Sequence, residues 1–289
     1  MAVSVIPHPF EMTRPSTYVL PVAVAGSAKE AERLDRLHQG MLNYFGQRLS
    51  LAPIEGIEPK KILDLGAGSG AWAIDAATRF PEASVLAVDI SPMPSRTVPM
   101  NFHFDQADIT KPFTYEDASF DIVHARWVIM HLPNAHDHLH RIFRLVKPGG
   151  WLIVEEPDTS NMKTAGQGPL SPGWSSMMEI WLSMLRERGI EPAIGRELAS
   201  IAQVSRYFDT IDSRKIEVPI SGTSCDQGEN GLGVVYKDTM RQVAGDLLKR
   251  NVHSDITPEL VRICLDELES TLFRLTLDAY FLSARRRVD

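Results

Sequence analysis

Residues 61–70, KILDLGAGSG, join a short apolar run to three closely spaced glycines, and they constrain the fold more than any other segment. The run reaches Asp64, and glycines at 66, 68 and 70 precede a stretch of helical character over residues 71–80. A second apolar run, SVLAVD, ends at Asp89. Because glycine adopts turn conformations that a Cβ disfavours, this order predicts a strand, a tight turn, a helix and a second strand.

The acidic end of the second strand predicts a nucleoside site. A carboxylate in the position of Asp89 is suited to accept hydrogen bonds from the hydroxyls of a ribose. Gly66, Gly68 and Ala71 also satisfy the dinucleotide fingerprint GxGxx(G/A), although that pattern alone is a weak signal. A nucleotide-dependent oxidoreductase is therefore one hypothesis.

Asp64 favours a different ligand. Its carboxylate stands two residues before the first glycine, where it would repel a pyrophosphate. A ligand with a cationic amino-acid tail fits an acidic turn better. S-adenosylmethionine has such a tail, with an ammonium, a sulfonium and no phosphate, so the residues favour it over a dinucleotide.

Four more motifs follow in order, namely VDIS, ADIT, FDIVHAR and LVKPGGWL. With DLGAGSG they resemble the class I S-adenosylmethionine-dependent methyltransferases over roughly residues 58–158. The N-terminal stretches TYVLP and EAERLDRLHQGM are similar to small-molecule methyltransferases of fungal secondary metabolism, a group that includes regulators. The resemblance implies a three-layer, Rossmann-like α/β fold with a mainly parallel seven-stranded sheet and an antiparallel last strand.

Alternating strand and helix signals over residues 60–158 also indicate a parallel sheet with helices on both faces. Further helices are expected at 28–50 (with Ser27 as N-cap), 174–188, 194–206, 234–251 and 257–272, strands at 209–220 and 273–285, and irregular chain at 1–27, 159–173 and 221–233. These patterns predict that the chain divides into three parts. Residues 1–57 form a segment that covers the cofactor, residues 58–158 form the cofactor-binding half, and residues 159–289 form a substrate cap plus the final strands of the same domain.

Ligands of open parallel sheets bind beyond the carboxyl ends of the strands. The resemblance, joined to this rule, predicts contacts to the cofactor from Asp64 (ammonium), Asp89 (ribose), Asp108, Ile109 and Ile90 (adenine), the turn Gly66, Ala67, Gly68 and Gly70 (methionine part), and Arg126 and Tyr18 (carboxylate). Plainer roles stay open as well: Asp89 as a strand-end cap, the glycines as a simple tight turn, Asp108 as a turn cap, Ile90 as a core residue and Arg126 as an exposed structural arginine.

His131 follows the fourth strand and is a candidate general base, since imidazole titrates near neutrality, although a structural histidine is the alternative. Trp127 and Glu156 are expected on the substrate side, while Met178 and Trp181 belong to an apolar helix face that is either a lid or core. His136, His138 and His140 have no acidic or cysteine ligand that can be placed beside them, so no metal is expected.

The net charge of -7 argues against broad nucleic-acid binding. The chain has no apolar stretch long enough to span a membrane and no secretory signal. Its two cysteines lack metal-ligand spacing and are too few for a disulfide framework, so a cytoplasmic protein is expected, with its oligomeric state undetermined.

The expected function is S-adenosylmethionine-dependent methyl transfer to the oxygen, nitrogen or sulfur of a small organic acceptor. Two alternatives keep the same fold. One is a regulatory binding protein, and the other is an enzyme that performs non-methylating chemistry.

Overall fold

The structure, a computed structural model, describes residues 3–4, 27–164, 169–220, 227–270, 272 and 274–288. Within them, seven strands form one sheet in the order β5-β3-β2-β6-β7-β9-β8. Their bounds are β2 Lys61–Leu65, β3 Ser84–Asp89, β5 Phe102–Gln106, β6 Phe120–Arg126, β7 Val146–Thr164, β8 Phe208–Pro219 and β9 Leu275–Arg286. Strands β2, β3, β5, β6 and β7 pair in parallel, whereas β9 runs antiparallel to β7 and β8. The predicted fold class is confirmed.

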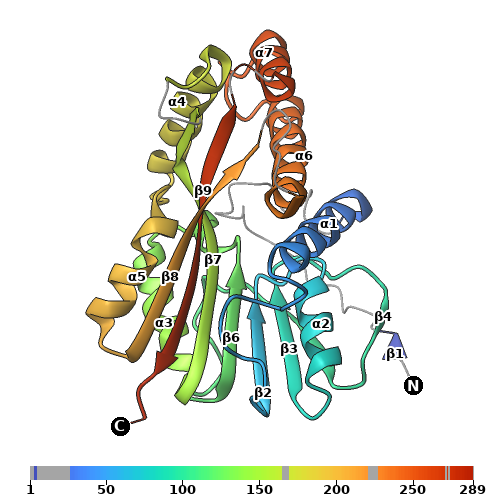
Figure 1. Ribbon diagram of the computed structural model, residues 1–289, viewed down its shortest axis with the longest axis vertical. Helices are drawn as coiled ribbons and strands as arrows, with labels where there is room; N and C mark the ends of the chain where they lie inside the picture. Colours follow the sequence, from blue (N-terminus) through green and yellow to red (C-terminus); the bar gives the residue numbers. More distant parts are fainter. Residues whose placement is uncertain are drawn as a thin grey trace.

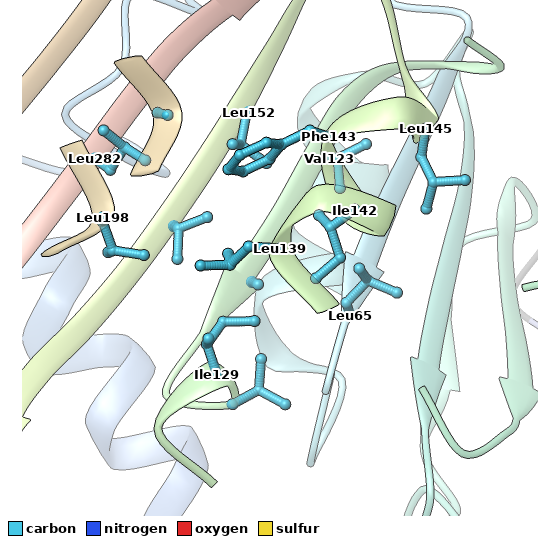
Figure 2. Close-up of a cluster of buried hydrophobic side chains, with 14 of the residues drawn as sticks. Leu65, Val123, Ile129, Leu139, Ile142, Phe143, Leu145, Leu152, Leu198 and Leu282 are labelled. Atoms are coloured by element: carbon cyan, nitrogen blue, oxygen red, sulfur yellow. The ribbon is translucent and has the colours of Figure 1, made fainter. Parts of the chain in front are cut away.

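Helices cover both faces of this sheet. Helices α3 (Ala135–Leu145) and α5 (Ile194–Ser205) pack on one face, and α2 (Ala71–Arg79) packs on the other. Side chains alternate across a strand, so Leu63 and Leu65 of β2 join the α3 side while Ile62 joins the α2 side. Figure 2 shows the α3 side, where leucines, isoleucines and a phenylalanine fill the space between helix and sheet.

The remaining helices form a cap. Helices α1 (Ala28–Tyr44), α4 (Pro172–Glu187), α6 (Gln227–Lys249) and α7 (Pro258–Glu269) pack with the far ends of β7, β8 and β9 in a second apolar cluster. In Figure 1, β7 and β9 extend past β2 and β3 toward α4, α6 and α7. The long strands β7 and β9 therefore contribute buried side chains to both clusters, one at the sheet and one in the cap.

Several predicted boundaries need correction. Residues 159–164, expected in a loop, continue β7 and pair with β9 after a register shift between Pro157 and Met162. Helix α6 begins at Gln227, inside the glycine-containing segment expected to be irregular. Helix α1 ends at Tyr44, earlier than expected, although the Ser27 cap is confirmed by a 3.2 Å bond from the Glu30 N–H.

A small second sheet adds one more difference. The two-residue strand β1 (Val3–Ser4) lies in the segment expected to be irregular, and it pairs antiparallel with β4 (Thr97–Val98).

Candidate active site

A cavity of about 240 Å³ lies beyond the carboxyl ends of β2, β3 and β6, beneath α1, α4 and α6. Most residues predicted for the site line it together, namely Asp64, Gly66, Ala67, Gly68, Asp89, Ile90, Asp108, Ile109, Arg126, Trp127, His131, Met178 and Trp181. Gly70 and Glu156 are not in its lining, and Tyr18 lies outside the described residues.

The glycine turn is fixed by backbone conformation and close packing. Gly66 and Gly68 have φ angles of 68° and 57°, in the left-handed region that glycine favours. A Cβ on Gly66 would lie 2.4 Å from a methyl group of Val128, and one on Gly68 would lie 2.7 Å from Leu34. These glycines therefore allow the segment after β6 and helix α1 to approach the turn closely. Gly70 plays a related part at the start of α2, where a Cβ would meet Met93 at 2.6 Å.

Asp64 lies at the base of the cavity, nearly inaccessible to solvent. Its Oδ1 is 2.7 Å from Nδ1 of His124 on the neighbouring strand, and burial raises its pKa to about 7. Arg126 and His38 act in the opposite direction, because positive charge favours the ionised carboxylate. His124 also lines the cavity, and the sequence analysis did not single it out.

Asp89 and Asp108 occupy the tips of the next strands. Asp89 accepts hydrogen bonds from the N–H groups of Gly68 (2.7 Å) and Ser91 (2.8 Å), and burial raises its pKa. Asp108 accepts from the backbone N–H and the hydroxyl of Thr110, at 2.9 and 2.6 Å. Asp108 thus caps the following turn and also faces the cavity, so its two predicted roles coexist.

Arg126 is a partly buried structural residue as well as part of the cavity wall. Its Nε donates to the carboxylate of Glu155, and its Nη1 lies 3.2 Å from Nδ1 of His38. These contacts hold the guanidinium against the base of the cavity. A two-pronged bond from Arg126 to a ligand carboxylate would compete with the buried Glu155.

A buried ion pair on α1 forms part of the cavity wall that the sequence analysis missed. Arg33 donates to both oxygens of Glu30, at 2.9 and 2.6 Å, and to the hydroxyl of Thr239 on α6, at 3.1 Å. Gln242 of α6 donates to Glu30 at 3.1 Å. The i,i+3 spacing of Glu30 and Arg33 was the available signal, but their burial depends on α6, more than two hundred residues away.

His131 and Glu156 have contrasting environments. Burial, assisted by the positive charge of Arg33, lowers the pKa of His131 to about 4, so its imidazole is neutral at physiological pH. Glu156 accepts the backbone N–H groups of Val128 and Ile129, at 3.0 and 2.7 Å, and burial raises its pKa to about 8. Glu156 therefore fixes the turn after β6, whereas His131 faces the cavity.

The cap end of the cavity is an apolar chamber. Its walls are Trp174, Met177, Met178 and Trp181 of α4, Met240, Val243, Ala244 and Leu247 of α6, Met162 of β7 and Leu277 of β9. Trp127 lies where the chamber meets the strand tips, with its ring edge-on to Tyr236 at a centroid distance of 4.5 Å. The predicted Met and Trp face therefore does line the cavity.

Neither a metal cluster nor a membrane-spanning helix is present among the described residues. The described residues contain no group of three or more His, Cys, Asp or Glu side chains that could hold a metal ion, and His136 instead lies 3.2 Å from Glu197. Among the same residues, every helix is too short or too polar to cross a lipid bilayer.

Comparisons with known proteins identify relatives for most of the chain. A family profile described as a methyltransferase domain matches residues 35–205. "Methyltransferase str3" of Strobilurus tenacellus is 40% identical over 204 residues, covering 70% of this chain and 72% of the relative. "Methyltransferase str2" of the same species is 32% identical over 258 residues, covering 89% and 92%.

A regulator and a solved structure are also similar. "Secondary metabolism regulator laeA" of Aspergillus flavus is 32% identical over 278 residues, covering 92% of this chain and 72% of the relative. A phosphoethanolamine N-methyltransferase of Haemonchus contortus, solved with S-adenosyl-L-methionine, aligns with a TM-score of 0.54 and 16% identity, covering 96% of this chain and 62% of that one. At that identity the structural match shows the shared fold.

Proposed function

This chain belongs to the methyltransferase family and is an S-adenosylmethionine-dependent enzyme, and from that premise we propose that it methylates a small, largely apolar acceptor in secondary metabolism. The observation that carries the proposal is the cavity itself, which joins a polar end at the strand tips to the apolar chamber under α4 and α6. A single space of this kind holds a polar methyl donor against an apolar acceptor.

The polar end suits the methyl donor. Asp64 presents an unpartnered buried oxygen to a cationic ammonium, Asp89 lies at the tip of β3 for the ribose, and Asp108 lies at the next tip for the adenine. When bound, S-adenosylmethionine supplies a methyl group that its sulfonium has already activated. The protein then needs to orient the acceptor and exclude water.

The apolar end suits an acceptor with one polar group. The chamber walls favour hydrocarbon or aromatic surface, and methionine side chains adapt to irregular shapes. At its edge, Glu30 and Arg33 form a pair whose charges cancel, able to accept from and donate to one neutral hydroxyl. This pair supports a hydroxyl-bearing acceptor over a highly charged one.

His131 is the proposed proton acceptor for such a hydroxyl. Burial and Arg33 disfavour the charged form of its imidazole, which is therefore neutral but a weak base. It is suited to receive the proton as the methyl group bonds to the oxygen, because that bond makes the remaining O–H strongly acidic. A thiolate or an amine would need less assistance.

The direct test is product formation. The protein would be incubated with methyl-deuterated S-adenosylmethionine and three acceptor sets: apolar phenols and alcohols, apolar carboxylic acids, and hydrophilic amines. We expect labelled products, detected by mass spectrometry, mainly from the apolar hydroxyl set. Labelled products from the hydrophilic amines alone would contradict the proposal.

A second candidate function rests on the similarity to laeA, whose printed name is that of a regulator. In that case the protein would act as a binding partner, with catalysis secondary. Affinity purification of the full chain tests it: a stable stoichiometric protein complex, together with no turnover in the product assay, would favour regulation over small-molecule methylation.

A further inference from the structure

Asp64 and His124 are partners in the parallel sheet, on the neighbouring strands β2 and β6, where they stand opposite each other in the register. Their side chains are 3% and 1% exposed, and Oδ1 of Asp64 is 2.7 Å from Nδ1 of His124. The sheet itself therefore fixes this hydrogen bond, because neither backbone can shift without breaking the β2–β6 pairing.

Trp72 of α2 holds the imidazole ring from one side. The two rings are stacked, with centroids 3.7 Å apart and planes 5° apart. Trp72 is anchored in turn by a 3.1 Å hydrogen bond from its indole N–H to the carbonyl of Leu49. The stack keeps the His124 ring in the orientation that presents Nδ1 to Asp64.

Asp64 and His124 each have a second polar atom that takes no part in their mutual hydrogen bond. Among the described residues, Oδ2 of Asp64 and Nε2 of His124 have no hydrogen-bond partner, although both atoms are buried and both residues line the cavity. An unpaired buried carboxylate oxygen is costly unless a ligand satisfies it. A cationic donor at Oδ2 would do so.

The surrounding charges determine which partner holds the proton. Burial lowers the pKa of His124 well below its usual value, so the imidazole is neutral and carries its proton on Nδ1 when Asp64 is ionised. Asp64 titrates at about 7, where small changes in its surroundings decide its charge. The other charged or titratable groups acting on this pair are His38 of α1, Arg126 of β6, Asp89 of β3 and Glu155 of β7.

We propose that His124 is a positioning residue of the methyl-donor site: its Nδ1–H favours the ionised form of Asp64 and aims Oδ2 at the ammonium group of the donor. This inference rests on the proposed placement of that ammonium beside Asp64. It assigns His124 no contact with the methyl group or the acceptor.

Two variants separate the hydrogen bond from mere packing. His124→Asn keeps an N–H donor near the Nδ1 position, whereas His124→Leu removes the donor at similar bulk. Affinity for S-adenosylhomocysteine would be measured by calorimetry from about pH 6 to 9. Since only ionised Asp64 attracts the ammonium, wild-type affinity should fall as the pH drops through about 7.

We expect His124→Asn to keep that midpoint, and His124→Leu to move it upward and to weaken binding at pH 7 by about tenfold. His124→Gln, whose amide reaches the Nε2 position instead, should behave like His124→Leu and serves if the leucine variant does not fold. His103→Asn, at an exposed site on edge strand β5, is the matched control.

The outcomes separate the two proposals. Equal midpoints and affinities in wild type, His124→Leu and His124→Gln would overturn the role of His124 and leave the methyl-donor site intact. Equal damage in His124→Asn and His124→Leu would also overturn it, because the donor would then be irrelevant. Absence of binding by the wild-type protein would instead refute the proposed function.

Discussion

Asp89 is the residue whose removal tests the nucleoside site most directly. Its carboxylate faces the cavity while holding the N–H groups of Gly68 and Ser91. Asp89→Ala should lower affinity for S-adenosylhomocysteine by about 100-fold, because hydrogen bonds to a charged group are lost. Asp105→Ala, at an exposed site on β5, should leave calorimetric affinity unchanged. An unaltered affinity in the Asp89 variant would remove it from the ribose site.

Replacing His131 tests its proposed role as a general base. As a general base it must be neutral, and its pKa of about 4 keeps it so throughout the physiological range. His131→Ala should therefore slow methylation of hydroxyl acceptors by about 100-fold without weakening cofactor binding. His140→Ala on α3 is the control, since that residue is exposed. A wild-type rate in the His131 variant would make it a structural histidine.

Individual residues differ in how well the sequence predicts them. Asp64 was predictable because it precedes a glycine turn by two residues, and Asp89 because it ends the next apolar run. Glu30 and Arg33 were not, since a charged i,i+3 pair normally marks the solvent face of a helix, and only α6 buries it here. Glu156 was expected at the substrate side, but the backbone N–H groups that engage it come from a turn whose shape no local pattern reveals.

The cavity-facing side of helix α4 is predicted to bind the acceptor. Met178 lies on its cavity face, whereas the adjacent Glu179 is exposed. Met178→Lys should raise KM for an apolar acceptor at least about tenfold, because it buries a charge in the chamber. Glu179→Lys should have no such effect. Calorimetry should show unchanged S-adenosylhomocysteine binding in both, and an unchanged KM in the first would place the acceptor elsewhere.

Some helices and strands could be predicted from local sequence patterns, and others could not. The strand–helix alternation over 60–158 was readable because the turns carry their own glycines and prolines. The start of α6 was not, because glycine in that segment serves tertiary packing: a Cβ on Gly233 would lie 2.1 Å from the carbonyl oxygen of Pro219. Residues 159–164 are mostly polar and resemble a loop, yet the pairing of residues 162–164 with β9 extends the strand through them.

At the scale of the whole molecule, ligand binding should stabilise sheet and cap together, because the cavity is walled by both. S-adenosylhomocysteine at about 100 times its Kd should stabilise the protein by about 2.7 kcal/mol. For a chain of this size that corresponds to a rise in Tm of about 4–5 °C. Differential scanning fluorimetry would measure it. A comparable rise with a nicotinamide dinucleotide, and none with S-adenosylhomocysteine, would favour the oxidoreductase hypothesis.

The sheet order has a consequence for how the protein is made. Because β9 lies between β7 and β8, translation must reach Leu275 and continue beyond it before β8 can join the sheet. A ribosome stalled earlier would hold a chain with two long unpaired strand edges. Such edges template association between chains, so nascent copies of this protein depend on prompt completion or on chaperones more than its finished fold suggests.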